Sequence, residues 1–186
     1  MHDLSRKAIT LVLGGVRSGK SRYAQALAAG VAPVAFVATA RSSDSDEEMR
    51  RKIERHQTDR PQDWKTIEEP LDLASVLREQ GPNYRIIVVD CLTLYAANLL
   101  QAEHGNLLAV EERLQRFYAA LRSASCSVAL VSNEVGSGIV PSFPEGRSYR
   151  DLLGEINQEV ATIADTVLLM VAGIPLVLKG TAEVLG

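Results

Sequence analysis

Short apolar runs alternate along the chain with longer stretches in which apolar residues recur every three or four positions. The short runs are nearly continuous and rich in β-branched residues, a pattern typical of parallel strands covered on both faces. The longer stretches have the period of helices with one buried face. Strands are predicted over residues 9–13, 34–39, 85–90, 127–132 and 166–171, with an edge strand over 175–179 after a turn at Gly173. Helices are predicted over residues 20–29, 46–57, 71–79, 92–101, 110–123 and 148–164.

The regular alternation of strand and helix predicts an α/β fold. A mostly parallel, doubly wound sheet with right-handed crossovers and helices on both faces is the architecture expected from it. The chain has 186 residues. This length favours one domain over residues 1–186, because most domains contain between 50 and about 250 residues.

Two segments interrupt the pattern. Residues 41–69 hold 16 charged side chains in 29 positions, which fits a solvated helix. Residues 133–147, NEVGSGIVPSFPEGR, form a long Gly- and Pro-containing loop after a predicted strand. Long loops in compact domains are often functional, and ligands of open α/β sheets bind at the carboxyl ends of the strands. Both segments are therefore candidates to border one site.

Composition excludes several classes of protein. Lys and Arg number 20 and Asp and Glu number 23, for a net charge of −3 without a basic tract, which argues against a dedicated nucleic-acid binder. Two cysteines, Cys91 and Cys126, can form neither a disulfide framework nor a four-cysteine zinc site. No apolar run approaches the length of a membrane span, and the first residues have too short an apolar core for a signal peptide. A reduced, cytoplasmic protein is expected.

A phosphate-binding loop follows the first predicted strand and opens the first predicted helix. The segment fits the pattern G-x-x-x-x-G-K-[ST] at every fixed position. Glycines allow the backbone N–H groups to approach a polyphosphate closely, and the following helix presents its positive end to the anion. The candidate nucleotide-binding residues here are Gly14, Gly15, Val16, Arg17, Ser18, Gly19, Lys20 and Ser21.

Two residues of this loop, and one acidic residue elsewhere, have specific chemistry. Lys20 is expected to reach the β- and γ-phosphates as a catalytic cation, and the Ser21 hydroxyl is expected to bind Mg²⁺. Asp90 ends the predicted strand RIIVVD, where a carboxylate can hold the same Mg²⁺ opposite Ser21. An Asp that merely begins a turn is the alternative for position 90. Cys91 beside it is interpreted as a buried thiol without a chemical role.

His56 has two interpretations. On its predicted helix it shares a face with Met49, Lys52 and Ile53, as a structural histidine would. A neutral imidazole is also a good nucleophile towards phosphorus, which would permit a covalent intermediate. Spacing alone leaves both open.

Several blocks of the sequence together resemble the adenosylcobinamide kinase / adenosylcobinamide-phosphate guanylyltransferase family. The blocks occur in the family's order and cover residues 12 to about 174. Two of them are specific to the family: the stretch R-K-I-x-x-H-x-x-x-R-P around His56, and Asn133–Pro141. Besides the His56 stretch, the blocks are GGVRSGKSRYA, VVDCLTLYAANLL, SNEVGSGIVP and RSYRDLLGEINQEVA.

The resemblance implies a bifunctional enzyme of cobalamin biosynthesis. One activity phosphorylates adenosylcobinamide with ATP or GTP, and the other transfers GMP from GTP to the resulting phosphate, giving adenosylcobinamide-GDP and pyrophosphate. It implies that His56 carries GMP covalently, that the fold is the recombination-ATPase type of phosphate-loop fold, and that the chain forms small rings, commonly trimers. Further nucleotide contacts are implied for Thr39, Ala40, Arg41, Gln57, Thr58, Asp59, Arg60, Glu68 and Asp90.

Two other classes remain as alternatives. A simple phosphate-loop kinase with a structural His56 would leave no nucleotide covalently attached to the protein. A regulatory or motor NTPase would need partner-binding segments or a basic surface, for which this chain has little room.

Overall fold

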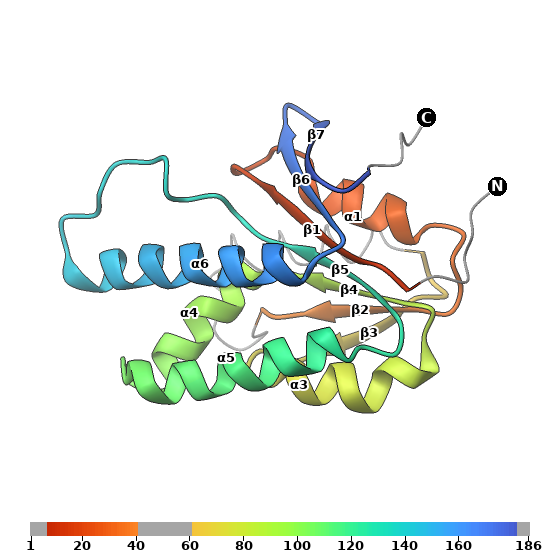
Figure 1. Ribbon diagram of the computed structural model, residues 1–186, viewed down its shortest axis with the longest axis horizontal. Coiled ribbons are helices and arrows are strands. Elements are labelled where there is room, and N and C mark those ends of the chain that lie inside the picture. The colour runs from red at the N-terminus through yellow and green to blue at the C-terminus, as the bar shows by residue number, and fades with distance from the viewer. Residues whose placement is uncertain (1–6, 41–60, 182–186) are drawn as a thin grey trace.

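The computed structural model describes residues 7–40 and 61–181. The strands form one seven-stranded sheet in the order β3-β2-β4-β5-β1-β6-β7, in which every neighbouring pair is parallel except β6 and β7. This mostly parallel sheet confirms the predicted fold class (Figure 1). The strands are β1 (Ile9–Gly14), β2 (Val34–Ala38), β3 (Lys65–Glu68), β4 (Ile86–Asp90), β5 (Ser127–Val131), β6 (Thr166–Val171) and β7 (Ile174–Lys179).

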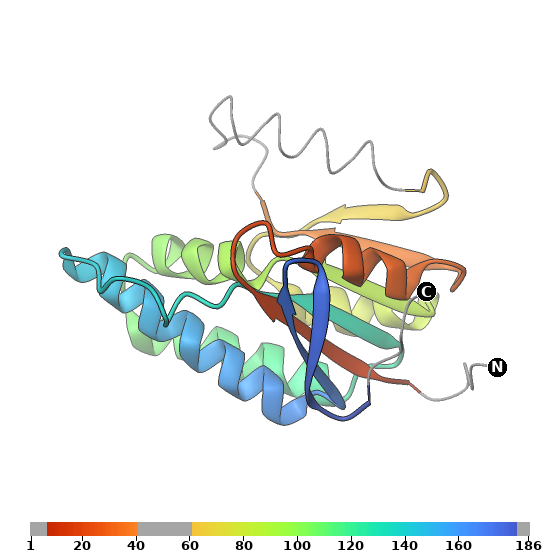
Figure 2. The ribbon, with the colours of Figure 1, turned by 90° about the horizontal axis from the view of Figure 1, so that it is seen from above.

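The described helices cover both faces of the sheet, as Figure 2 shows from above. Helix α1 lies on one face, and α3 to α6 lie on the other (Figure 1). The helices are α1 (Lys20–Ala28), α3 (Leu73–Ser75), α4 (Leu92–Ala102), α5 (Leu107–Arg122) and α6 (Pro144–Ile163), with a π turn (Val76–Gln80) and a 3₁₀ turn (Gly81–Asn83) after α3. No described helix is both long and apolar enough to cross a membrane.

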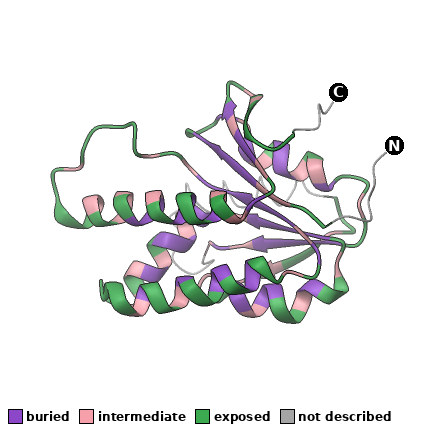
Figure 3. Cartoon of the chain, viewed as in Figure 1, coloured by how far each residue is buried: buried purple, intermediate pink, exposed green. Residues whose placement is uncertain are grey.

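Alternation along the strands produces two separate cores. In β4, Ile87 and Val89 belong to the larger core beneath α3 to α6, whereas Ile86 and Val88 belong to the smaller core beneath α1. Successive side chains of a strand point to opposite faces, so a continuous apolar run is required where both faces are covered. Figure 3 shows the resulting band of buried residues through the centre of the sheet.

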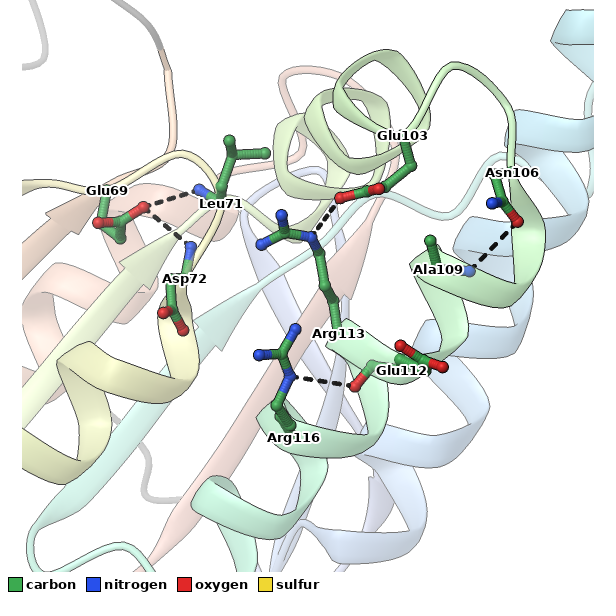
Figure 4. A network of polar contacts seen from close by, with 9 residues as sticks. All are labelled: Glu69, Leu71, Asp72, Glu103, Asn106, Ala109, Glu112, Arg113 and Arg116. Carbon is green, nitrogen blue, oxygen red and sulfur yellow. Dashed lines mark hydrogen bonds and ion pairs between the residues drawn. The ribbon is translucent and has the colours of Figure 1, made fainter.

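Side chains define the turns and helix starts on the α4–α5 side of the molecule (Figure 4). One oxygen of Glu69 accepts hydrogen bonds from the N–H groups of Leu71 and Asp72, which fixes the turn between β3 and α3. The Asn106 side chain accepts from the N–H of Ala109 and so caps α5. Arg113 on α5 pairs with Glu103 at the end of α4.

The observed elements differ from the predicted ones in four places. Strand β3 was not predicted, and the predicted helix 71–79 is a three-residue α-helix followed by a π turn. Helices α5 and α6 begin at Leu107 and Pro144, three and four residues before their predicted starts at 110 and 148. The predicted helix 46–57 lies outside the described residues.

Candidate nucleotide site

The phosphate-loop motif lies between β1 and α1, at the carboxyl edge of the sheet. Its backbone has positive φ at Gly14 (150°), Arg17 (58°) and Gly19 (97°). A Cβ on Gly14 would lie 2.6 Å from both the Met170 carbonyl oxygen and the Ser18 hydroxyl, so only glycine fits this position. The sequence motif and the geometry therefore agree on a tightly wound loop that opens a helix.

Lys20, the first residue of α1, is 8% exposed despite its charge. Its Nζ donates a hydrogen bond of 2.6 Å to the carbonyl oxygen of Gly15 in the same loop. The ammonium group is therefore held across the loop, where a polyphosphate wrapped by the loop would meet it.

Ser21 and Asp90 meet at the same edge of the sheet. The Ser21 hydroxyl donates to Oδ1 of Asp90 over 3.3 Å. Strand β5 separates β1 from β4, and the parallel order places all three carboxyl ends together. A hydroxyl and a carboxylate are the hard oxygen donors that Mg²⁺ prefers, and Mg²⁺ typically takes few protein ligands beside phosphates and waters. In the described part of the chain, no group of three or more His, Cys, Asp and Glu side chains is placed to hold a metal ion.

Thr39 joins the end of β2 to the residue after Asp90. Its hydroxyl accepts from the Cys91 N–H over 2.9 Å and donates to the Cys91 carbonyl over 2.8 Å. Its backbone N–H donates to the Asp90 carbonyl, and its own carbonyl accepts from the Asn98 side chain of α4. Thr39 is fully buried, and its contacts hold the ends of β2 and β4 together.

Two more of the predicted contact residues lie close to this edge. In the register of the sheet, Glu68 of β3 and Asp90 of β4 both pair with Ala38 of β2, one from each side. Glu68 is exposed, and Ala40 is the second residue after the end of β2. The other predicted residues, Arg41, His56, Gln57, Thr58, Asp59 and Arg60, lie outside the described residues.

Cys91 is unsuited to nucleophilic chemistry at neutral pH. Burial, and after it the neighbouring Asp90 carboxylate, raise the pKa of its thiol to about 11. The neutral thiol is a poor nucleophile, in agreement with the interpretation of Cys91 as an inert residue.

A loop over residues 133–143 leaves the site beside the phosphate loop. The Glu134 N–H donates to the Gly14 carbonyl over 3.2 Å, and the Asn133 N–H donates to the Thr93 hydroxyl over 3.0 Å. Further along, Ile139 is 98% exposed, and Val140 and Phe143 are also exposed. The backbone of this loop runs away from the sheet toward the start of α6 (Figure 1), and its apolar side chains are exposed to solvent.

Three supporting residues at this edge were not found from the sequence. Thr93 holds the start of the loop, Asn98 bridges Thr39 and the Pro70 carbonyl, and Asn157 of α6 donates to the Asn133 carbonyl. A polar residue on the buried face of a helix is the signal that could have identified Asn98 and Asn157.

Comparison with known proteins identifies the family. The model of the family "Cobinamide kinase / cobinamide phosphate guanyltransferase" matches residues 10–178. The chain belongs to this family. It is 43% identical over 172 residues to the bifunctional adenosylcobalamin biosynthesis protein CobP of Pseudomonas aeruginosa, with 91% of this chain and 96% of that protein covered. It is 36% identical over 180 residues to the Escherichia coli protein CobU of the same description, with 91% and 98% covered.

Membership in the cobinamide kinase / cobinamide phosphate guanyltransferase family makes the chain a transferase. Among solved structures, a prototypical ATPase from the type III secretion system of pathogenic bacteria is similar, with a TM-score of 0.51 and 14% identity. The match covers 87% of this chain and 51% of that one, so the chain spans about half of the ATPase. At this identity the likeness concerns the fold alone, and it agrees with the predicted phosphate-loop fold.

Proposed function

We propose that the chain phosphorylates adenosylcobinamide with ATP or GTP and then transfers GMP from GTP to adenosylcobinamide phosphate. The products of the second step are adenosylcobinamide-GDP and pyrophosphate. The observation that carries the proposal is the wound loop with Lys20 across it, in a member of a kinase and guanyltransferase family. Both reactions transfer phosphorus groups, so positioning and charge neutralisation at one such loop can serve both.

In the guanylyl transfer, His56 is the proposed nucleophile. One imidazole nitrogen attacks the α-phosphorus of GTP, a P–N bond forms, and the bond from the α-phosphorus to the bridging oxygen breaks as pyrophosphate leaves. An oxygen of adenosylcobinamide phosphate then attacks the same phosphorus, and the P–N bond breaks to release the imidazole. The first step needs a neutral imidazole, because only an unprotonated ring nitrogen can attack the phosphorus.

Groups in the described part of the site would stabilise the negative charge of the leaving pyrophosphate. Lys20 and the backbone N–H groups of residues 14–21 would bind it, as in other phosphate loops. Mg²⁺ bound by Ser21 and Asp90 would neutralise further phosphate charge when present. Nucleotide contacts at Thr39, Ala40 and Glu68 remain part of the proposal, because these residues follow or flank the end of β2.

The corrinoid is proposed to lie along residues 133–143. The loop begins next to the phosphate loop, where the Glu134 N–H donates to the Gly14 carbonyl. A molecule bound along residues 133–143 can therefore present its hydroxyl or phosphate to the phosphate loop. The exposed Ile139, Val140 and Phe143 offer apolar contacts to a large amphipathic ring.

Small rings of this chain, trimers by resemblance, are also proposed. Strand β7 supports this assembly, since Ile174, Leu176 and Leu178 are each more than half exposed at an edge of the sheet. Edge strands with exposed apolar residues are commonly covered by another chain.

The decisive experiment is labelling with GTP that carries ³²P at the α-phosphate, in parallel with GTP that carries ³²P at the γ-phosphate. We expect acid-labile, alkali-stable label from the α-position alone in the wild type. His56→Asn should abolish it. His104→Asn is the matched control, because His104 is exposed in the turn after α4 and its positive φ of 50° is tolerated by Asn.

Either result is informative about the class of enzyme. Label that survives in His56→Asn would assign the nucleophile to another residue. Folded protein that phosphorylates a small molecule but acquires no α-label would instead be a simple phosphate-loop kinase.

A further inference from the structure

The turn between β6 and β7 is in direct contact with the phosphate loop. Val171 and Ile174 are paired across it, so the turn contains only Ala172 and Gly173. Both have positive φ, 51° and 83°. Two central residues with positive φ are typical of a tight type I′ hairpin turn, which leaves this segment little freedom of its own.

This turn is hydrogen-bonded to the phosphate loop. The Gly173 N–H donates to the Ser18 carbonyl over 2.9 Å. A Cβ on Gly19 would lie 3.2 Å from the Gly173 Cα, so the two glycine backbones are in close contact. At the other end of the loop, Gly14 is confined by the Met170 carbonyl, as described above.

The hydrogen bond determines the orientation of one peptide group. The Ser18–Gly19 peptide is trans, and in a trans peptide the C=O and N–H groups point in opposite directions. With the Ser18 carbonyl directed at Gly173, the Gly19 N–H is directed away from the hairpin. In a phosphate loop, inward-facing N–H groups such as this one hold the polyphosphate.

We propose that Gly173 is a positioning residue for nucleotide binding: its N–H fixes the Ser18–Gly19 peptide so that the Gly19 N–H faces the phosphates. This inference rests on the proposed use of the loop for GTP. The close approach requires glycine at position 19, where a Cβ would lie 3.2 Å from the Gly173 Cα, and any side chain at position 173 would strain the positive φ that the turn needs.

The test compares Gly173→Val with Gly30→Val. Both glycines have a similar positive φ, 83° and 77°, so the backbone strain of the two substitutions is matched. Gly30 has no atom within 4 Å of an added Cβ, whereas Gly173 adjoins Gly19 and Arg22. We expect Gly173→Val to raise the Kd for GTP with Mg²⁺ by about tenfold or more, and Gly30→Val to leave it unchanged at a comparable loss in Tm.

A second readout follows the Gly19 amide directly. In the wild type, the Gly19 N–H resonance should shift on addition of GTP, and this shift should be reduced in Gly173→Val. If Gly173→Val does not fold, Gly173→Ala replaces it, because its Cβ meets only the end of the flexible Arg22 side chain at 3.3 Å. An unchanged Kd in a folded Gly173 variant would overturn the inference. Wild-type protein that fails to bind GTP would contradict the proposed function itself, so the two failures are distinguishable.

Discussion

The hydroxyl of Thr39 satisfies both backbone groups of Cys91, as acceptor from its N–H and as donor to its carbonyl. The contact joins residues that are far apart in the chain at the ends of two adjacent strands. Asp90 immediately precedes Cys91, so the same contact fixes the backbone that carries the proposed Mg²⁺ ligand.

Replacing this hydroxyl should lower both the rate of α-label transfer and the free energy of unfolding, although the shape of the side chain is nearly unchanged. Thr39→Val has nearly the same shape and leaves two backbone groups of Cys91 without their partner, which should lower the free energy of unfolding by about 1–3 kcal/mol. The rate of α-label transfer should fall about tenfold, since Asp90 loses its support. Thr39→Ser keeps the hydroxyl and should retain the rate. Chemical denaturation and the labelling assay measure the two effects, and equal rates in both variants would refute the link to Asp90.

Asp90 itself should control the requirement for Mg²⁺. In Asp90→Asn we expect the Mg²⁺ concentration for half-maximal labelling to rise about 10- to 100-fold, because a neutral amide binds the cation more weakly. Asp151→Asn is the control, as Asp151 is exposed on α6. A Mg²⁺ dependence that is the same in Asp90→Asn and wild type would remove Asp90 from the metal site.

The exposed loop side chains should matter for the corrinoid alone. Ile139→Asn changes a side chain that is 98% exposed, so Tm should be unchanged. The KM for adenosylcobinamide should rise several-fold while α-labelling by GTP continues at the wild-type rate. Leu108→Asn, at an exposed apolar position on α5, should alter neither quantity. Equal loss of labelling and corrinoid turnover in Ile139→Asn would place the corrinoid elsewhere.

Stability should fall at alkaline pH through the buried Tyr95 and Tyr118 and the partly buried Tyr149. Burial raises the pKa of Tyr149 to about 12 and also raises the pKa values of Tyr95 and Tyr118. The unfolded chain releases phenolic protons near pH 10, before the folded state does, so the free energy of unfolding should decrease as pH rises above about 10.

Denaturation measured between pH 9 and about 12 tests this expectation. Each phenol whose pKa is raised in the folded state contributes a slope of up to about 1.4 kcal/mol per pH unit in this range. Tyr149→Phe should therefore show a shallower decline than the wild type. Parallel curves for the two proteins would show that Tyr149 ionises alike in the folded and unfolded states.

The central strands could be predicted from the sequence because they are buried on both faces. Strand β3 could not, since it is a four-residue edge strand, KTIE, whose charged side chains are exposed and whose Ile67 is only half-buried. The start of α5 was missed because the exposed Leu107 and Leu108 break the expected helical pattern. At α6, Pro144 followed by Glu145 is a recognisable helix start, but the Gly and Pro residues around it also fit the predicted loop.

In the candidate site, the loop of residues 14–21 could be predicted because a local sequence pattern defines it. The proximity of Ser21 and Asp90 was also expected, because carboxyl ends of parallel strands share one edge. The contact of Gly173 with Ser18 was not expected, although a turn at Gly173 was. Such a contact depends on strand order, and a sequence pattern does not reveal that β6 lies beside β1.

The uneven division of the core has a consequence for how the molecule opens. Among the described helices, α1 alone packs on the face that carries the phosphate loop, and the core beneath it is the smaller of the two. Local opening costs less free energy where less apolar surface is exposed by it. A nucleotide held at the start of α1 adds its binding energy to this weaker side. A nucleotide bound as proposed would thus act as a structural brace for this face of the sheet.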